Sequence, residues 1–128
     1  MKLILFVLIS LFLNNAFSAG TKNEDGSFKL QEKSLKTMGI KFEKLSGKGP
    51  WLLPSNALVK IKFTQGVYRK IDEDITYVLV STLKADGNSV LVSSVDLESD
   101  DEVAIEGVHF LRLTEADLNS DTVDNCAH

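Results

Sequence analysis

One short acidic stretch is the first candidate for chemistry in this sequence. Asp96, Glu98 and Asp100 stand at alternate positions, as the first ligands of a calcium-binding loop do. An EF-hand loop requires Gly at its sixth position and Glu at its twelfth, whereas this chain has Asp101 and Gly107 there. The pattern therefore excludes an EF-hand, and it favours a solvated acidic turn over a specific metal site.

Imidazole and sulfur side chains are the second candidate, because such groups bind transition metals. Beyond the N-terminal segment they are Met38, His109, Cys126 and His128. One residue separates Cys126 from His128, so these two could chelate Cu(I) or Zn together. A structural zinc site, however, uses about four ligands, and His109 lies between two apolar residues as a packing residue would. The sequence leaves His109, Cys126 and His128 as metal candidates, with a free thiol near the C-terminus as the alternative.

No catalytic motif accompanies these residues. The sequence contains neither a Gly-x-Ser-x-Gly nucleophile motif nor a Gly-rich phosphate loop. His109 has no orienting acid close to it in the sequence, and the carboxylates fall on expected turns, where solvent keeps them ordinary acids. We therefore expect a non-catalytic protein that uses no cofactor.

The elements that must position these residues are mostly strands, and the clearest is a hairpin. Residues 75–83 are rich in β-branched and aromatic side chains, which favours a strand with one buried face. Asp86-Gly87 is a strong turn signal, because Gly accepts a positive φ without steric cost. Residues 89–95 then predict the returning strand. The residues expected on the buried face of the first strand are Ile75, Tyr77, Leu79 and Leu83.

Shorter elements are expected around this hairpin. A helical turn at residues 34–38 should stop at Gly39, and Pro54 should mark an edge strand or a bend because it lacks an N–H. Turns are expected at 64–66 and 72–74, and residues 108–113 suit either a strand end or a short helical turn. Further strands are expected at 28–30, 40–45, 58–63, 67–71 and 103–105. These patterns predict a mostly-β barrel or β-roll of about six short strands, with one or two short helical turns and no long amphipathic helix.

The length of 128 residues suits one domain with terminal extensions. The start has a Lys2 n-region, an apolar run at 3–13 and small residues near 18, which predicts a cleaved signal peptide over an uncleaved anchor. The expected divisions are a signal peptide at 1–19, a flexible leader at 20–27, the β-domain at 28–118 and a polar tail at 119–128.

Charge and cysteine content point to the compartment and exclude some partners. Removal of the signal peptide takes away one lysine and no acid, which leaves 13 basic against 18 acidic residues. That balance disfavours sequence-independent nucleic-acid binding, which needs clustered Lys and Arg. A single cysteine cannot form an internal disulfide, so an apolar core must hold the fold. We expect a periplasmic protein, with secretion as the alternative, that does not span the membrane after cleavage.

Four segments, taken in order, resemble the membrane-proximal domain of periplasmic adaptor (membrane-fusion, HlyD-type) proteins of RND efflux systems. The family has a Pro-x-x-Ala core motif, a short Val-Tyr strand and a later Gly-punctuated strand-turn pattern. Asp96, together with either Ser99 or Asp100, stands where the family usually has glycines. The matching segments are 38–40 (MGI), 53–59 (LPSNALV), 66–68 (GVY) and 95–111 (VDLESDDEVAIEGVHFL).

The resemblance implies a transporter-docking module that acts by protein–protein contact, with an inner-membrane RND transporter or a full-length adaptor as the partner. The lipoyl-like domain and the long helical hairpin of a full adaptor are not found in this sequence. The loops at 47–53 and 96–102 are the expected contact elements, with Trp51, Glu98, Asp100 and Asp101 as contact residues. A core position for Trp51 is the alternative. From another class, a small periplasmic metal- or ligand-binding accessory protein remains an alternative function.

Overall fold

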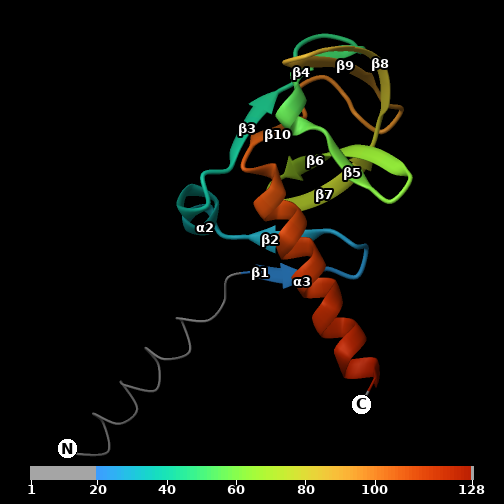
Figure 1. Cartoon of the computed structure of the whole chain (residues 1–128). Helices are drawn as coiled ribbons and strands as arrows, with labels where there is room; N and C mark the ends of the chain where they lie inside the picture. The colour runs from blue at the N-terminus through green and yellow to red at the C-terminus, as the bar shows by residue number, and fades with distance from the viewer. Residues whose placement is uncertain (1–19, 128) are drawn as a thin grey trace, which may run out of the picture.

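The structure is a computed structural model that describes the backbone of residues 20–127 and the side chains of residues 20–119 (Figure 1). Within this part of the chain lie ten strands, two α-helices and one 3-10 helix. The strands are β1 Gly20–Lys22, β2 Phe28–Leu30, β3 Lys41–Lys44, β4 Trp51–Pro54, β5 Val59–Ile61, β6 Thr64–Ile71, β7 Asp74–Leu79, β8 Ser81–Asp86, β9 Ser89–Ser93 and β10 Glu102–Glu106. The helices are α2 Glu32–Thr37, η1 Ser55–Ala57 and α3 Val108–Ala127. The predominance of strands confirms the predicted mostly-β fold.

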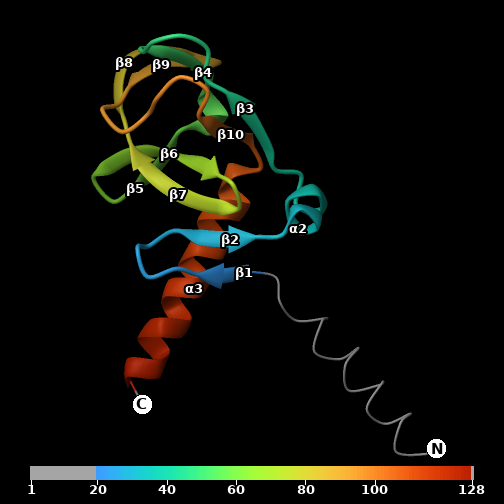
Figure 2. The same cartoon turned by 180° about the vertical axis from the view of Figure 1, so that it is seen from behind.

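The strands form two antiparallel sheets. The larger sheet has the order β1-β2-β7-β6-β10-β3, with β5 paired to β6 beside this path. The smaller sheet has the order β4-β9-β8. Figures 1 and 2 show the smaller sheet at one end of the molecule, next to the central strands of the larger one. The sheets are not closed into a barrel, and the described residues hold ten strands where the sequence predicted about six.

The predicted hairpin is confirmed as β8 and β9. Asp86 pairs with Ser89, so Gly87 and Asn88 form a two-residue turn in which Gly87 has a φ of 55°. The Ser55 N–H donates to the Asn88 carbonyl at 2.9 Å, and the Ser55 hydroxyl donates to the Gly87 carbonyl at 2.8 Å. The turn is therefore held against η1, which follows the bend at Pro54.

The single strand predicted at 75–83 is wrong, because it divides between the two sheets at Val80. The Val80 N–H still donates to the carbonyl of Gln65 on β6 at 3.0 Å, whereas the next residue, Ser81, pairs with Ser93 of β9 in the smaller sheet. Leu79 and Leu83, expected on a buried face, are 54% and 58% exposed. Leu83 lies beyond the residue at which the chain changes sheet, where the phase of the period-two pattern no longer applies, and Leu79 is the last residue of β7 before that change.

Two hydrophobic cores lie on opposite faces of the central strands β6, β7 and β10. Along β6, Val67 faces the core between the two sheets, and its neighbour Tyr68 faces the core beneath the helices. Val103 and Ala104 divide in the same way on β10. Because successive side chains of a strand point to opposite faces of the sheet, consecutive residues of β6 and β10 contribute to different cores. The sheet core also contains Leu45, Trp51, Leu53, Val90 and Val92, and the helix core contains Phe28, Leu30, Leu35, Ile75 and Leu111.

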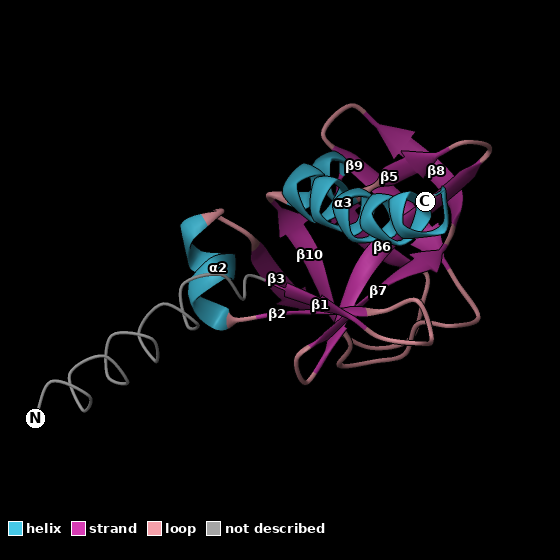
Figure 3. Cartoon of the chain, turned by 90° about the horizontal axis from the view of Figure 1, so that it is seen from below, coloured by secondary structure: helices cyan, strands magenta, loops and turns pink. Residues whose placement is uncertain are grey.

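Helix α3 covers one face of the larger sheet (Figure 3). Val108 and Leu111 are buried against the sheet. The buried Tyr68 hydroxyl donates to the Glu115 carboxylate at 3.0 Å. Burial, followed by the negative charge of Glu115, raises the pKa of Tyr68, so its hydroxyl remains a hydrogen-bond donor. None of the helices in residues 20–127 combines the length and apolar character needed to cross a membrane.

Several local predictions are corrected by these elements. Residues 108–113, expected as a strand end or one turn, begin a 20-residue helix whose backbone continues through the expected polar tail. Residues 20–22 of the expected leader form β1, which pairs with β2. The turn expected at 64–66 lies at Lys62-Phe63, because Ile61 pairs directly with Thr64.

Other local predictions are confirmed, because each depends on short-range chemistry. Gly39 ends α2 with a φ of 70°. Pro54 lies on β4, which is an edge strand of the smaller sheet. The turn expected at 72–74 is a two-residue connection, since Ile71 pairs with Asp74. The signal peptide expected at 1–19 lies outside the described residues.

Candidate functional site

The acidic loop between β9 and β10 is a folded turn held by one of its own carboxylates. The Asp101 side chain accepts a hydrogen bond from the Glu98 N–H at 2.8 Å. The loop also pairs with the chain after β3: Leu45 donates its N–H to the Asp101 carbonyl at 2.9 Å and accepts from the Asp100 N–H at 2.8 Å. Asp101 is only 17% exposed. Asp101 thus makes its contacts within the fold, whereas Glu98 and Asp100 are exposed, and contact of these residues with a partner stays a prediction.

Arg69, which the sequence did not single out, fastens this loop to the larger sheet. Its guanidinium Nη1 donates to the Asp96 carbonyl at 2.6 Å and lies 3.8 Å from the Asp101 carboxylate. The Arg69 side chain projects from β6, 27 residues before Asp96 in the sequence, so no local pattern links them. The Arg69 Nε is buried without an acceptor in the described residues, which offsets part of the stabilisation that the Nη1 contacts provide.

Replacing Arg69 with Met should therefore lower the free energy of unfolding by about 1–2 kcal/mol, because the loop loses a charge-assisted hydrogen bond. Chemical denaturation measures the change. Lys29→Met is the matched control: Lys29 and Asp74 lie 3.9 Å apart at exposed positions, and such a surface pair contributes less than about 1 kcal/mol. Equal losses in the two variants would show that Arg69 does not fasten the loop.

The predicted metal ligands do not form a cluster in the described part of the chain. No group of three His, Cys, Asp or Glu side chains among residues 20–119 has a metal-binding arrangement. His109 is exposed and lies against the ring of Phe110, with the ring centroids 4.4 Å apart. Met38 is half-buried and packs on the helix core. The side chain of Cys126 and all of His128 lie outside the described residues.

Trp51, expected as a contact residue, is buried in the core between the sheets. Its side chain is 7% exposed, and its indole N–H donates to the Gly47 carbonyl at 3.1 Å. A Cβ on Gly49 would lie 2.8 Å from the Trp51 ring, so the loop 47–50 passes directly over the indole. The contact role is corrected to a packing role, which was the alternative for this residue.

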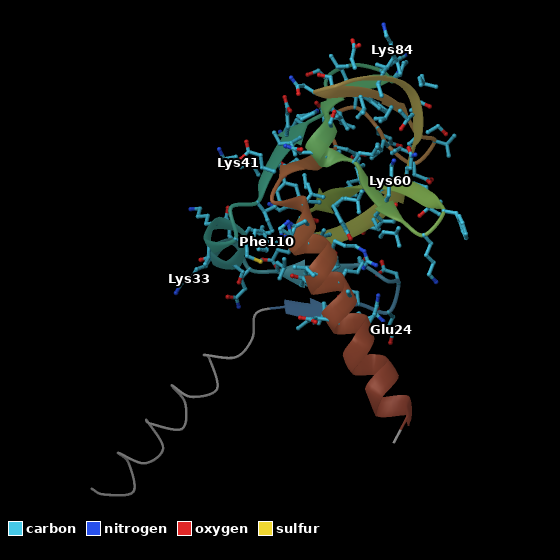
Figure 4. All side chains as sticks on the ribbon, in the orientation of Figure 1. Glu24, Lys33, Lys41, Lys60, Lys84 and Phe110 are labelled. Carbon is cyan, nitrogen blue, oxygen red and sulfur yellow. The ribbon has the colours of Figure 1, made fainter. Side chains whose placement is uncertain are left out.

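The outer face of the smaller sheet carries exposed apolar side chains. On β4, Leu52 points outward because Trp51 and Leu53 on either side of it are buried inward. Leu52 pairs with the half-buried Leu91 of β9. On β8, Lys84 pairs with Leu91, and Leu83 is the extra residue of a bulge between Thr82 and Lys84. We call Leu52, Leu91 and Leu83 the outer apolar row; Lys84, labelled in Figure 4, stands beside it.

A second exposed apolar region lies where the two sheets open apart. A groove of about 1050 Å³ runs between the β5–β6 turn and the chain that follows β9. Phe63 and Val95 stand on it with almost fully exposed side chains, at 104% and 99%, and Leu79 is half-exposed. The groove also receives residues from both loops that the sequence marked as contact elements: Gly49, Pro50 and Trp51 from one, Asp96 and Leu97 from the other.

Hydrogen bonds hold the walls of this groove. The Thr82 hydroxyl donates to the Gln65 side-chain carbonyl at 2.7 Å, which joins β8 to β6. The Ser94 hydroxyl donates to the Leu79 carbonyl at 2.8 Å. Each bond connects residues from different elements, so the groove is a preformed surface of the folded domain.

A polar cleft near the N-terminal hairpin has a structural explanation. Asn23 donates from its amide to the Asp74 carboxylate at 2.8 Å and to the Ser27 hydroxyl at 2.9 Å. The hydroxyl and N–H of Ser27 bond to Asp25 and lower the pKa of that carboxyl. These contacts join the β1–β2 turn to β7, and they account for the polar side chains of this cleft without a ligand.

No family model, curated protein or solved structure matches this chain.

Proposed function

We propose that this protein is a non-catalytic docking domain, exported to the periplasm, that binds an inner-membrane RND transporter or its full-length adaptor. The docking surface is the outer face of the smaller sheet. The partner class follows from the resemblance of four sequence segments to the membrane-proximal domain of efflux adaptors. The surface follows from where the described residues leave apolar side chains unburied.

The observation that carries the proposal is the outer apolar row. Leu52 and Leu83 are 68% and 58% exposed; Leu52 pairs with Leu91, and Leu83 precedes Lys84, which pairs with Leu91 from the other side. Contiguous exposed apolar side chains on a folded surface typically mark interaction sites. Leu52 belongs to the 47–53 segment that the sequence analysis marked as a contact element.

The strand edges of the same sheet support binding through its face. A strand edge that adds a partner strand needs a regular row of free backbone groups. In the smaller sheet, Pro54 interrupts the edge of β4, and the bulge at Leu83 disturbs the edge of β8. Leu83 is exposed at this bulge, so the position that disturbs the edge also carries an apolar side chain.

The experiment is a pull-down from gently solubilised cell envelopes, using the tagged full chain exported with its own leader. Bound proteins are identified by mass spectrometry. We expect wild-type protein to recover an RND transporter or a full-length adaptor. The double variant Leu52→Asp, Leu83→Asp should recover at least ~10-fold less of it, because two charges would be buried unpaired in the interface.

Leu113→Asp is the matched control, since Leu113 is 57% exposed but lies on α3. It should recover as much partner as the wild type. Equal recovery by the double variant would rule out the outer apolar row as the docking surface. Failure of the wild type to recover either partner would rule out the proposed function itself.

A further inference from the structure

We propose that the groove between the sheets is a two-fold interface that binds a second copy of this chain. This inference concerns a different surface from the outer apolar row and does not depend on the proposed docking function. It rests on the two rims of the groove, which we call the hairpin lip (Lys62 and Phe63) and the loop lip (Val95 and Asp96).

Each lip pairs one fully exposed apolar side chain with one charge. The hairpin lip has Phe63 next to the cation of Lys62, and the loop lip has Val95 next to the anion of Asp96. Phe63, Val95 and Asp96 line the groove itself. The two lips are therefore alike in apolar character and opposite in charge.

Both lips are held in place by the fold. The hairpin lip is a two-residue turn in which Lys62 has a φ of 56°, and the Thr64 hydroxyl closes it by donating to the Ile61 carbonyl at 2.7 Å. In the loop lip, the Asp96 N–H donates to the Ser94 hydroxyl at 3.2 Å, and its carbonyl accepts from Arg69. A preformed surface loses less conformational entropy on binding, which favours association.

The charges of the lips are free to pair with another molecule. Within residues 20–119 the ion pairs join Lys29 to Asp74, Lys41 to Glu106, Arg69 to Asp101, Lys70 to Glu102 and Arg112 to Glu115. Neither Lys62 nor Asp96 belongs to any of them. A partner of one charge sign would match one lip and oppose the other.

A second copy matches both lips at once. In a two-fold interface the two copies use the same surface patch and are related by a 180° rotation. The hairpin lip of each copy can then face the loop lip of the other. Lys62 then meets Asp96 twice, and Phe63 meets Val95 twice. Each copy offers only two exposed apolar side chains and two charges on its lips, so we expect a weak association with a dissociation constant of about 1–100 μM.

Sedimentation equilibrium of the protein purified from cells that express the full chain tests this inference. We expect a monomer–dimer equilibrium over about 1–500 μM. Lys62→Glu and Asp96→Lys, each alone, should weaken dimerisation at least ~10-fold, because each places like charges opposite each other. Asp96 contributes only backbone groups to the fold contacts described above, so the substitution leaves them in place.

Mixing the two single variants should restore the dimer. In the mixed pair, the glutamate that replaces Lys62 on one copy faces the lysine that replaces Asp96 on the other, and the second contact keeps its natural Asp96 and Lys62. Glu98→Lys is the matched control, since Glu98 lies in the same loop but outside the groove. It should dimerise within about threefold of the wild type, because its exposed charge is screened by salt.

Three results would overturn the proposal: a monomer at every concentration, dimerisation that survives both single reversals, or no recovery on mixing. If Lys62→Glu instead abolished recovery of a transporter while the wild type remained monomeric, the groove would belong to that partner. The Leu52→Asp, Leu83→Asp variant should dimerise as the wild type does, because neither substitution lies in the groove. Failure of the docking proposal can therefore be distinguished from failure of the dimer proposal.

Discussion

Gly66→Ala is expected to lower the free energy of unfolding by about 3 kcal/mol, because the added methyl group has no room. A Cβ on Gly66 would lie 2.5 Å from the ring of Tyr77 and 2.5 Å from the Val78 carbonyl. The Tyr77 ring has little room to move, since its hydroxyl donates to the Val59 carbonyl at 3.0 Å and its ring packs on Tyr68. Glycine in a strand interior is ordinarily destabilising relative to alanine, so the expected sign is reversed here.

The midpoint of chemical denaturation measures this change. Gly87→Asn is the control, because Gly87 lies in the hairpin turn with a positive φ that Asn accepts, and nothing lies within 4 Å of the place that a Cβ would take there. We expect Gly87→Asn to unfold within about 1 kcal/mol of the wild type. A Gly66→Ala protein as stable as the wild type would mean that the Tyr77 ring is not held over β6.

Leu111→Ala should lower the free energy of unfolding by about 2–5 kcal/mol, because it would leave a cavity beneath α3. Leu111 is fully buried in the helix core. The helix is otherwise polar over much of its length, so few side chains hold it to the sheet. Loss of Leu111 should therefore also reduce the helical signal at intermediate denaturant, where wild-type α3 is still docked.

Leu113→Ala is the matched control on the same helix. Leu113 is 57% exposed, and the two substitutions change helix propensity equally. Urea denaturation followed by circular dichroism should place Leu113→Ala within about 0.5 kcal/mol of the wild type. Comparable losses in both variants would contradict the packing of α3 through Leu111.

The elements that could be predicted from sequence are those set by local chemistry. The Gly87 turn and the Gly39 helix end each depend on a positive φ within a few residues. The division of residues 75–83 between two sheets depends on their pairing with two distant strands, first β6 and then β9, which periodicity does not report. The full length of α3 was not predicted because Val108 and Leu111 form only one apolar pair at helical spacing, and the sequence after Leu113 is mostly polar.

The candidate site was predictable in position but not in chemistry. The loops 47–53 and 96–102 do border the exposed surfaces. Two of the side chains that the sequence suggested as contact residues instead make contacts within the fold. Trp51 is buried in the core, and the Asp101 carboxylate lies beside Arg69 and accepts a hydrogen bond from the Glu98 N–H. Leu83 and Phe63 are exposed where a bulge and a two-residue turn interrupt alternation, and such irregularities depend on how the strands pair.

The shared central strands have a consequence for folding cooperativity. Val67 and Tyr68 are adjacent in β6, yet they stabilise cores on opposite sides of the larger sheet. Both cores pack on the same strands, β6, β7 and β10. Loss of one core therefore exposes the strands on which the other core packs. The two cores are thus expected to melt in a single all-or-none transition, in which Trp51 on one side and Tyr68 on the other report the same midpoint.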